Sequence, residues 1–250
     1  MRVKAFMGLL ASERLKLVRS PIWLLVLVSP ILALTAGFLS SLDDVAPEAR
    51  YLILQSSVFT VHAILLLPIL TGIFASFVCR FEHSGGGWKS MLSLPVSRTG
   101  LYAAKFITVA LLLAVTQLLT LVSLIISVKF QGIEGGMDWG AAISATVSGW
   151  VACLPLAALQ LWASIGWSSF AAPLAINVAF TLPNMLVVNS ERFSPFYPWA
   201  QPSLAMLSSG GGSMDFGGFT LPLVNILGTV LVSFVVFLCG GLMHMRRKEI

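Results

Sequence analysis

Six stretches of about 20 residues contain no Asp, Glu, Lys or Arg, and they constrain the fold of this chain more than any other feature. They run over residues 22–42, 58–79, 106–128, 140–162, 169–189 and 221–243. A helix needs about 20 apolar residues to cross the roughly 30 Å hydrocarbon core of a bilayer. The runs are continuous, whereas strands of a membrane barrel alternate apolar and polar residues. The sequence therefore predicts an all-α membrane protein with six transmembrane helices in a single transmembrane domain, residues 1–250.

Composition supports this prediction. The chain is 57% hydrophobic and 10% charged, against about 45–50% and about 25% in soluble domains. Such a chain has too few polar groups to cover a surface that faces water. Only residues 163–168 separate the fourth run from the fifth, so one broken crossing is an alternative. About fifty residues are too many for a single crossing, however.

The basic residues predict the orientation. With six spans, twelve of the fifteen Lys and Arg residues fall on the side of both termini, and Arg50, Lys129 and Arg192 fall on the other. Positive residues are retained in the cytoplasm. We therefore predict a multi-pass membrane protein with both termini in the cytoplasm. The net charge of +5 lies between the apolar runs, which argues against a nucleic-acid partner.

Residues 2–19 precede the first run and have helical periodicity. One face carries Val3, Phe6, Met7, Leu10 and Leu17, and the opposite face carries Lys4, Ser12, Lys16 and Arg19. This pattern predicts an amphipathic helix in the cytoplasmic interface, in contact with membrane lipids. The alternative is a plain basic tail that only sets the orientation.

A second cytoplasmic segment lies between the second and third runs, at residues 80–98. A Gly-rich turn is followed by a short apolar helix from Trp88 to Leu94, which Pro95 should end. Ser97 is then the expected N-cap of the next helix.

The sequence contains no recognisable catalytic motif. Residues 85–90, Gly-Gly-Gly-Trp-Lys-Ser, do not satisfy the spacing of a phosphate-binding loop, because Trp88 occupies its second glycine position. No hydrolase motif and no metal-binding spacing is present. We therefore predict a chain that is not an enzyme and that binds no cofactor or metal.

A few polar residues lie in or near the apolar runs. The commoner role of such residues is hydrogen bonding between helices, and the alternative is to line a substrate path. The candidates for this path are His62, Gln117, Gln160, Asn177, Asn184, Tyr197 and Trp199.

The segment after the second run resembles the cytoplasmic loop of type-2 ABC export permeases, and most closely that of the lantibiotic-immunity and bacitracin-resistance exporters. The resemblance rests on Glu82, Trp88-Lys89, Leu92-Ser93-Leu94-Pro95-Val96-Ser97-Arg98 and Tyr102-Ala103-Ala104-Lys105. Tyr197-Pro198-Trp199-Ala200-Gln201-Pro202, before the last run, fits the same group.

This resemblance implies a permease that pairs with a second permease copy or a paralogue and with two separate ABC ATPase subunits, which bind ATP and Mg²⁺. It implies a cytoplasmic coupling helix between the second and third spans that docks on the ATPase. The residues implied in this docking are Glu82, Trp88, Lys89, Met91, Leu92, Pro95 and Arg98. It further implies a location in the bacterial cytoplasmic (inner) membrane, and export of an amphipathic peptide, such as a lantibiotic or another antimicrobial peptide, for self-immunity or resistance.

Two other functions remain open at this point. A stand-alone secondary transporter or channel would work without an ATPase and would need a charged or broken-helix site at mid-membrane. A non-transporting scaffold or sensor subunit would bind partners without moving a substrate.

Overall fold

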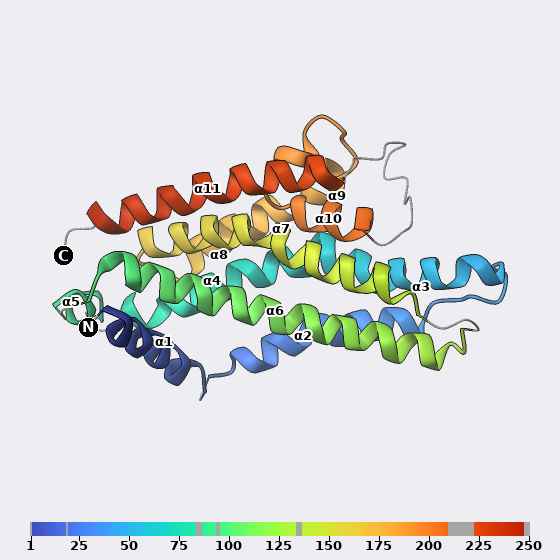
Figure 1. Ribbon diagram of the computed structural model, residues 1–250, viewed down its shortest axis with the longest axis horizontal. Coiled ribbons are helices and arrows are strands. Elements are labelled where there is room, and N and C mark those ends of the chain that lie inside the picture. Colours follow the sequence, from blue (N-terminus) through green and yellow to red (C-terminus); the bar gives the residue numbers. More distant parts are fainter. Residues whose placement is uncertain are drawn as a thin grey trace.

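The computed structural model describes residues 2–18, 20–83, 87–93, 96–133, 137–209 and 223–247, and every regular element in those ranges is a helix (Figure 1). The prediction of an all-α protein is confirmed. The helices are α1 (Arg2–Val18), α2 (Ile22–Phe38), α3 (Pro47–Val61), η1 (His62–Leu66), α4 (Leu67–His83), α5 (Gly87–Ser93), α6 (Arg98–Phe130), α7 (Trp139–Gly166), α8 (Ala171–Thr181), α9 (Asn184–Val187), η2 (Ser194–Phe196), α10 (Gln201–Ser209) and α11 (Leu223–Arg247).

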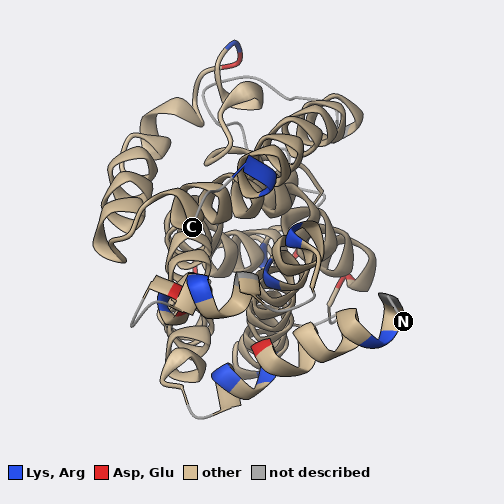
Figure 2. Ribbon diagram, turned by 90° about the vertical axis from the view of Figure 1, so that its left-hand side faces the viewer, with Lys and Arg blue, Asp and Glu red and all other residues tan. Residues whose placement is uncertain are grey.

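The long helices form one elongated bundle, with both chain ends at the same end of it (Figure 1). Helix α6 packs against α2, α4 and α7, and α7 packs in turn against α4, α10 and α11. Helices α1 and α5 lie at the end that carries the termini. We call this the basic end, because most of the described Lys and Arg residues gather there (Figure 2).

Four helical stretches are long and apolar enough to cross a membrane: Pro47–His83, Arg98–Phe130, Trp139–Gly166 and Val224–Arg247. A fifth results if α1 and α2, which meet at 72°, count as one bent span. The predicted run 22–42 is only 17 residues of helix in α2. The predicted run 169–189 is interrupted between α8 and α9, where Pro183 precedes the short helix α9.

The second predicted run is part of a much longer helix. Residues 47–83 are helical throughout, so the helix begins well before residue 58. Its middle, His62–Leu66, is a π-helical turn that ends just before Pro68. Proline has no N–H and cannot donate to the carbonyl one α-helical turn earlier, so an irregular turn is expected at this place.

Helix α6 has a cap at each end. The Ser97 hydroxyl oxygen accepts from Gly100 N at 3.1 Å, which confirms the predicted N-cap. At the other end Gly132 has φ of 59°, Gly132 N donates to Lys129 O, and Ile133 N donates to Val128 O. These two bonds form a Schellman motif, which requires a left-handed residue and therefore favours glycine.

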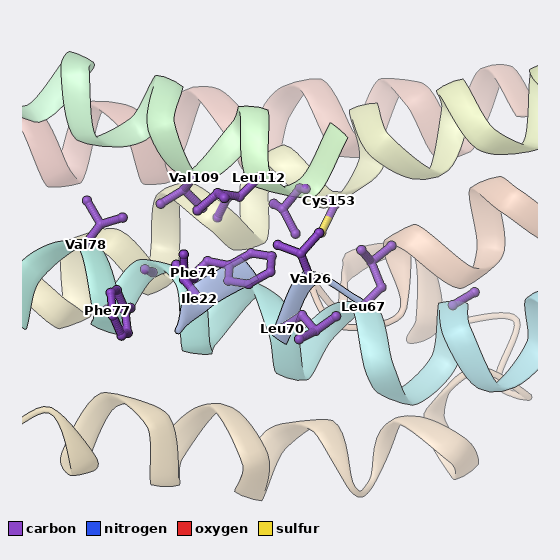
Figure 3. Close-up of a cluster of buried hydrophobic side chains, with 14 of the residues drawn as sticks. Ile22, Val26, Leu67, Leu70, Phe74, Phe77, Val78, Val109, Leu112 and Cys153 are labelled. Carbon is purple, nitrogen blue, oxygen red and sulfur yellow. The ribbon is translucent and has the colours of Figure 1, made fainter. Parts of the chain in front are cut away.

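The hydrophobic core lies between α2, α4, α6 and α7 (Figure 3). Helix α4 supplies Leu70, Phe74 and Phe77, which lie near Ile22 of α2 and Val109 of α6. These side chains hold α4 and α6 in register, and this fixes where the polar residues at the ends of both helices lie.

Helix α1 turns one narrow row of residues toward the bundle. The row is Leu9, Glu13 and Leu17, spaced four apart and buried. Val3 and Met7, from the predicted apolar face, are exposed instead. One carboxylate therefore faces the protein interior.

Candidate functional site

Four charged side chains meet inside the basic end: Glu13 and Lys16 of α1, Glu82 of α4 and Lys105 of α6. Lys16 Nζ lies 2.7 Å from Glu13 Oε1 and 2.5 Å from Glu82 Oε1. Lys105 Nζ lies 3.2 Å from Glu13 Oε1 and 2.7 Å from Glu82 Oε2. Each ammonium group thus contacts both carboxylates, and we call these four residues the charge cluster.

The charge cluster is almost fully removed from solvent. The Lys105 side chain has no exposed surface, each carboxylate side chain is 2% exposed, and Lys16 is 20% exposed. Lys105 Nζ also donates to Val78 O at 2.8 Å. Burial of a charge is costly unless the charge is paired and hydrogen-bonded. Two positive and two negative groups sum to zero, so each charge has its compensation inside the cluster.

Lys16 remains charged in this setting. Its desolvation disfavours the ammonium form, but the adjacent carboxylates of Glu13 and Glu82 outweigh desolvation and raise the pKa of Lys16 above its ordinary value. The ion pairs of the charge cluster thus hold α1 against the end of α4 and the beginning of α6.

Two cluster residues differ from what the sequence predicts. Glu82 is implied in docking on an ATPase, yet its carboxylate points inward to Lys16 and Lys105. Glu13 is absent from the predicted site. A signal for it does exist, because Glu13 is the only acidic residue in the basic segment 2–19.

Helix α5 is anchored through Trp88. Its indole Nε1 donates to His83 Nδ1 at 3.1 Å, and the two rings meet edge to face with centroids 5.6 Å apart. Because Nδ1 accepts, the other ring nitrogen carries the proton and donates to Ser164 O at 2.7 Å. A chain of hydrogen bonds therefore runs from α5, through the last residue of α4, to the end of α7.

The other predicted docking residues divide between the interior and the surface. Met91, like Trp88, is partly buried against the protein's own hydrophobic core, and Lys89 is exposed. Arg98 Nη1 donates to Arg246 O at 2.9 Å, which joins the beginning of α6 to the end of α11. Pro95 and the side chain of Leu92 lie outside the described residues.

His62 and Gln117 meet in the interior of the bundle. His62 Nδ1 lies 2.6 Å from Ser29 Oγ, and Nε2 lies 3.2 Å from Gln117 Oε1. Gln117 Nε2 donates to Met206 Sδ at 3.5 Å. Since the Gln117 oxygen can only accept, His62 Nε2 is the donor and Nδ1 accepts from the serine hydroxyl. Hydrogen bonds between neutral side chains thus link α2, η1, α6 and α10.

Asn177, Asn184 and Trp199 form a second polar group. Asn177 Nδ2 donates to Pro68 O at 2.9 Å, and Trp199 Nε1 donates to Asn177 Oδ1 at 2.8 Å. Asn184 Nδ2 donates to Ile64 O at 2.8 Å and to Trp199 O at 3.0 Å. Pro68 supplies no N–H to the Ile64 carbonyl, and Asn184 satisfies that carbonyl instead.

Tyr197 joins the same group from its edge. Its hydroxyl donates to Phe180 O at 2.5 Å, and the Phe180 ring stacks on Trp199 with centroids 4.9 Å apart. Gln160 is separate: it is buried, and its Oε1 has no hydrogen-bond partner among the described residues. The predicted path residues thus fall into two hydrogen-bonded groups and one isolated side chain.

Replacement of Asn177 by Ala is expected to lower the free energy of unfolding by about 1–2 kcal/mol, because Trp199 Nε1 loses its buried acceptor. Thermal unfolding in detergent measures the change. Asn189→Ala is the matched control, since Asn189 is exposed and bonds only within its own segment to Met185 O; it should change stability by less than about 0.5 kcal/mol. Equal effects of the two variants would contradict a structural role for Asn177.

Within the described ranges, no group of three or more His, Cys, Asp or Glu side chains is arranged to hold a metal ion.

Comparison with known protein families shows a match. A sequence profile of the family described as "ABC-2 family transporter protein" matches residues 9–184. This range contains every member of the charge cluster and the whole of α5. A search of individually curated proteins finds no match.

Proposed function

Because the chain belongs to the ABC-2 transporter family, and is thus a transmembrane permease component of an ABC transporter, we propose that it is the permease subunit of an ATP-driven exporter. Two ABC ATPase subunits, which bind Mg²⁺ and hydrolyse ATP, dock at its basic end, and a second permease copy or a paralogue completes the pore. The substrate is an amphipathic peptide of the lantibiotic or antimicrobial class, and its export gives immunity or resistance. Direction and substrate class rest on the resemblance of the 82–105 segment to such permeases.

The membrane topology that we propose has six spans, with α1 in the cytoplasmic interface and the whole chain as one domain. Helix α2 and the stretch Ala171–Val187 have 17 residues or fewer, near the lower limit of about 17 residues for a crossing. Both lie alongside longer helices, α2 against α6 and α8 against α4. The gathering of Lys and Arg at the basic end (Figure 2) supports a cytoplasmic position for that end and for both termini in the inner membrane.

One observation carries the proposed coupling role of α5. This short helix connects the end of α4 to the beginning of α6, and the charge cluster fixes both of these ends to α1. Trp88 ties α5 further to α7 through His83. A force that a partner applies to α5 would therefore reach α4 through the Trp88–His83 contact, and α7 through the hydrogen bond from His83 to Ser164 O.

The exposed side of α5 is the docking surface in this proposal. Lys89 and Ser90 are exposed there, while Trp88 and Met91 face the bundle. Trp88 acts as a positioning residue that presents this surface to the ATPase in one orientation. Preorganisation of this kind increases affinity because less freedom is lost on binding.

Trp88→Ala is expected to weaken association with the cognate ATPase by about 1–2 kcal/mol, roughly five- to thirtyfold in Kd, because the released helix must be ordered again on binding, and to abolish ATP-dependent export. Trp139→Ala is the matched control, because Trp139 is exposed at the opposite end of the bundle. Co-purification from membranes and transport into inverted vesicles measure the two effects.

The same assay separates the alternatives. Retention of full ATPase binding and export by Trp88→Ala would contradict the coupling role of α5. Export by the purified chain without any ATPase would identify a stand-alone transporter and contradict the exporter proposal as a whole.

A further inference from the structure

A groove of about 470 Å³ lies between α1, the beginning of α2 and α6. This volume falls within the ~300–1,000 Å³ range of sites that hold small molecules. The groove is lined by Met7, Leu10, Ala11, Arg14, Leu17, Trp23, Ile107, Thr108, Leu111, Leu112 and Val115. Leu111 is 59% exposed on the outer surface of the bundle, so the groove opens where a membrane protein meets lipid.

The polarity of the groove changes along α6. Lys105, in the charge cluster, lies in the second turn of α6, and the groove residues Leu111 and Val115 follow it toward the middle of the bundle. At about 1.5 Å per residue, Val115 lies roughly 15 Å farther along the helix than Lys105. The groove therefore runs from the level of the charges into the apolar belt, as a phospholipid does from its headgroup into its acyl chain.

Arg14 is the charged residue of the groove lining, and its charge is not compensated nearby. Its side chain forms no ion pair or hydrogen bond with any residue that the structure describes. The adjacent Glu13 is occupied by Lys16 and Lys105, and the charge cluster sums to zero. One positive charge thus remains at the polar end of an apolar groove.

We propose that this groove binds a phospholipid with an anionic headgroup from the cytoplasmic leaflet. The Arg14 guanidinium binds the phosphate, a pairing that guanidinium geometry favours, and one acyl chain lies along Leu10, Leu111 and Val115. A basic residue at the membrane surface contributes about 1 kcal/mol toward anionic lipid. The proposal requires the basic end to be cytoplasmic, but it does not depend on export or on an ATPase.

A lipid in the groove would stabilise the packing of α1 against the bundle. Its headgroup contacts α1 and its acyl chain contacts both α1 and α6, the two helices that Lys105 and Glu13 also join. An anionic lipid in the groove therefore holds α1 against the bundle from the outside, next to the contact that holds it from the inside.

The experiment uses the full-length chain in nanodiscs that contain equal amounts of phosphatidylglycerol and phosphatidylcholine with the same acyl chains. After transfer to detergent, the lipids that stay bound are identified by native mass spectrometry. The wild-type chain should retain phosphatidylglycerol in about fivefold excess, as about 1 kcal/mol predicts. Arg14→Gln should remove this excess, and Lys4→Gln, at an exposed basic residue of the same helix, should preserve it.

A second variant tests the apolar part. Leu111→Trp places a larger side chain in the groove and should reduce retention of both lipids, with an unchanged thermal midpoint as evidence of correct folding. Equal retention of the two lipids by the wild-type chain, or an undiminished excess in Arg14→Gln, would overturn the proposal. A photoactivatable residue at position 111 that crosslinks to a polypeptide instead of lipid would assign the groove to a protein partner and overturn it as well.

Discussion

Replacement of Lys105 by Met should lower the free energy of unfolding by about 3–5 kcal/mol, the effect of removing one partner from a buried ion pair. Lys105 has no exposed side-chain surface, and its ammonium group contacts both Glu13 and Glu82. Methionine preserves the length of the side chain, so the packing loss is small. The cost arises because two carboxylates then share the single charge of Lys16.

Lys129→Met is the matched control, since Lys129 is an exposed lysine near the other end of the same helix. It should change stability by less than about 0.5 kcal/mol. Unfolding is followed by thermal denaturation in detergent. A loss below about 1 kcal/mol for Lys105→Met would contradict the compensation described for the charge cluster.

An exchange of the charges gives an independent check. Glu82→Lys alone leaves three positive groups and one carboxylate in the charge cluster, and Lys105→Glu alone leaves three carboxylates and one positive group. Both single variants should be strongly destabilised. The double variant restores two charges of each sign, so it should recover part of the lost stability. Recovery should be incomplete, because the glutamate at position 105 cannot donate to Val78 O as Lys105 does.

The second large effect is expected at Gly241 in α11. A methyl group at this position would overlap the hydroxyl and ring of Tyr102. Tyr102 cannot move freely, because it is fully buried and its hydroxyl donates to Ala158 O at 3.2 Å. Gly241→Ala should therefore either push α11 away from α6 or break this hydrogen bond. We expect a loss of about 2–4 kcal/mol in the free energy of unfolding.

The same helix provides the control. Gly228 is exposed in α11, and a methyl group there meets no atom within 4 Å. Gly228→Ala should leave stability unchanged or raise it by up to about 1 kcal/mol, since alanine is the better helix former. Opposite signs for the two variants in one thermal unfolding series would support the close contact. A loss of equal size in both would contradict a specific role for the Tyr102 contact, because helix propensity favours alanine at both positions.

The uncharged runs predict well where helices occur, because only helices and closed barrels satisfy the backbone in a bilayer, and barrel strands alternate apolar and polar residues. The runs predict poorly where each helix begins and ends. Pro47–Ser57 is helical although it contains Glu48 and Arg50, since helix formation outside the hydrocarbon does not require apolar residues. The run 169–189 is interrupted near Pro183, a break that average hydropathy does not detect.

The candidate site was predictable only in part. Local sequence predicts the short helix after the second run, the N-cap at Ser97 and a hydrogen-bonding role for His62. The charge cluster does not, because it joins Glu13 to Lys105 across 92 positions and depends on how α1 docks. A single sequence holds no information on that contact. Glu82 therefore looks like a surface carboxylate until α1 and α6 are placed beside it.

The two lysines near the ends of α6 also define the bilayer thickness that fits the protein. Lys105, at the charge cluster, and Lys129, near the opposite end, are separated by about 36 Å of helix at about 1.5 Å per residue, with no other charged residue between them. This length slightly exceeds the roughly 30 Å hydrocarbon core of a bilayer. A thicker membrane would draw the buried cluster toward hydrocarbon, and a thinner one would bring apolar residues of α6 to water, each at a modest energetic cost per ångström of mismatch. The acyl-chain length of the host membrane therefore acts directly on the contacts that hold α1, α4 and α6 together.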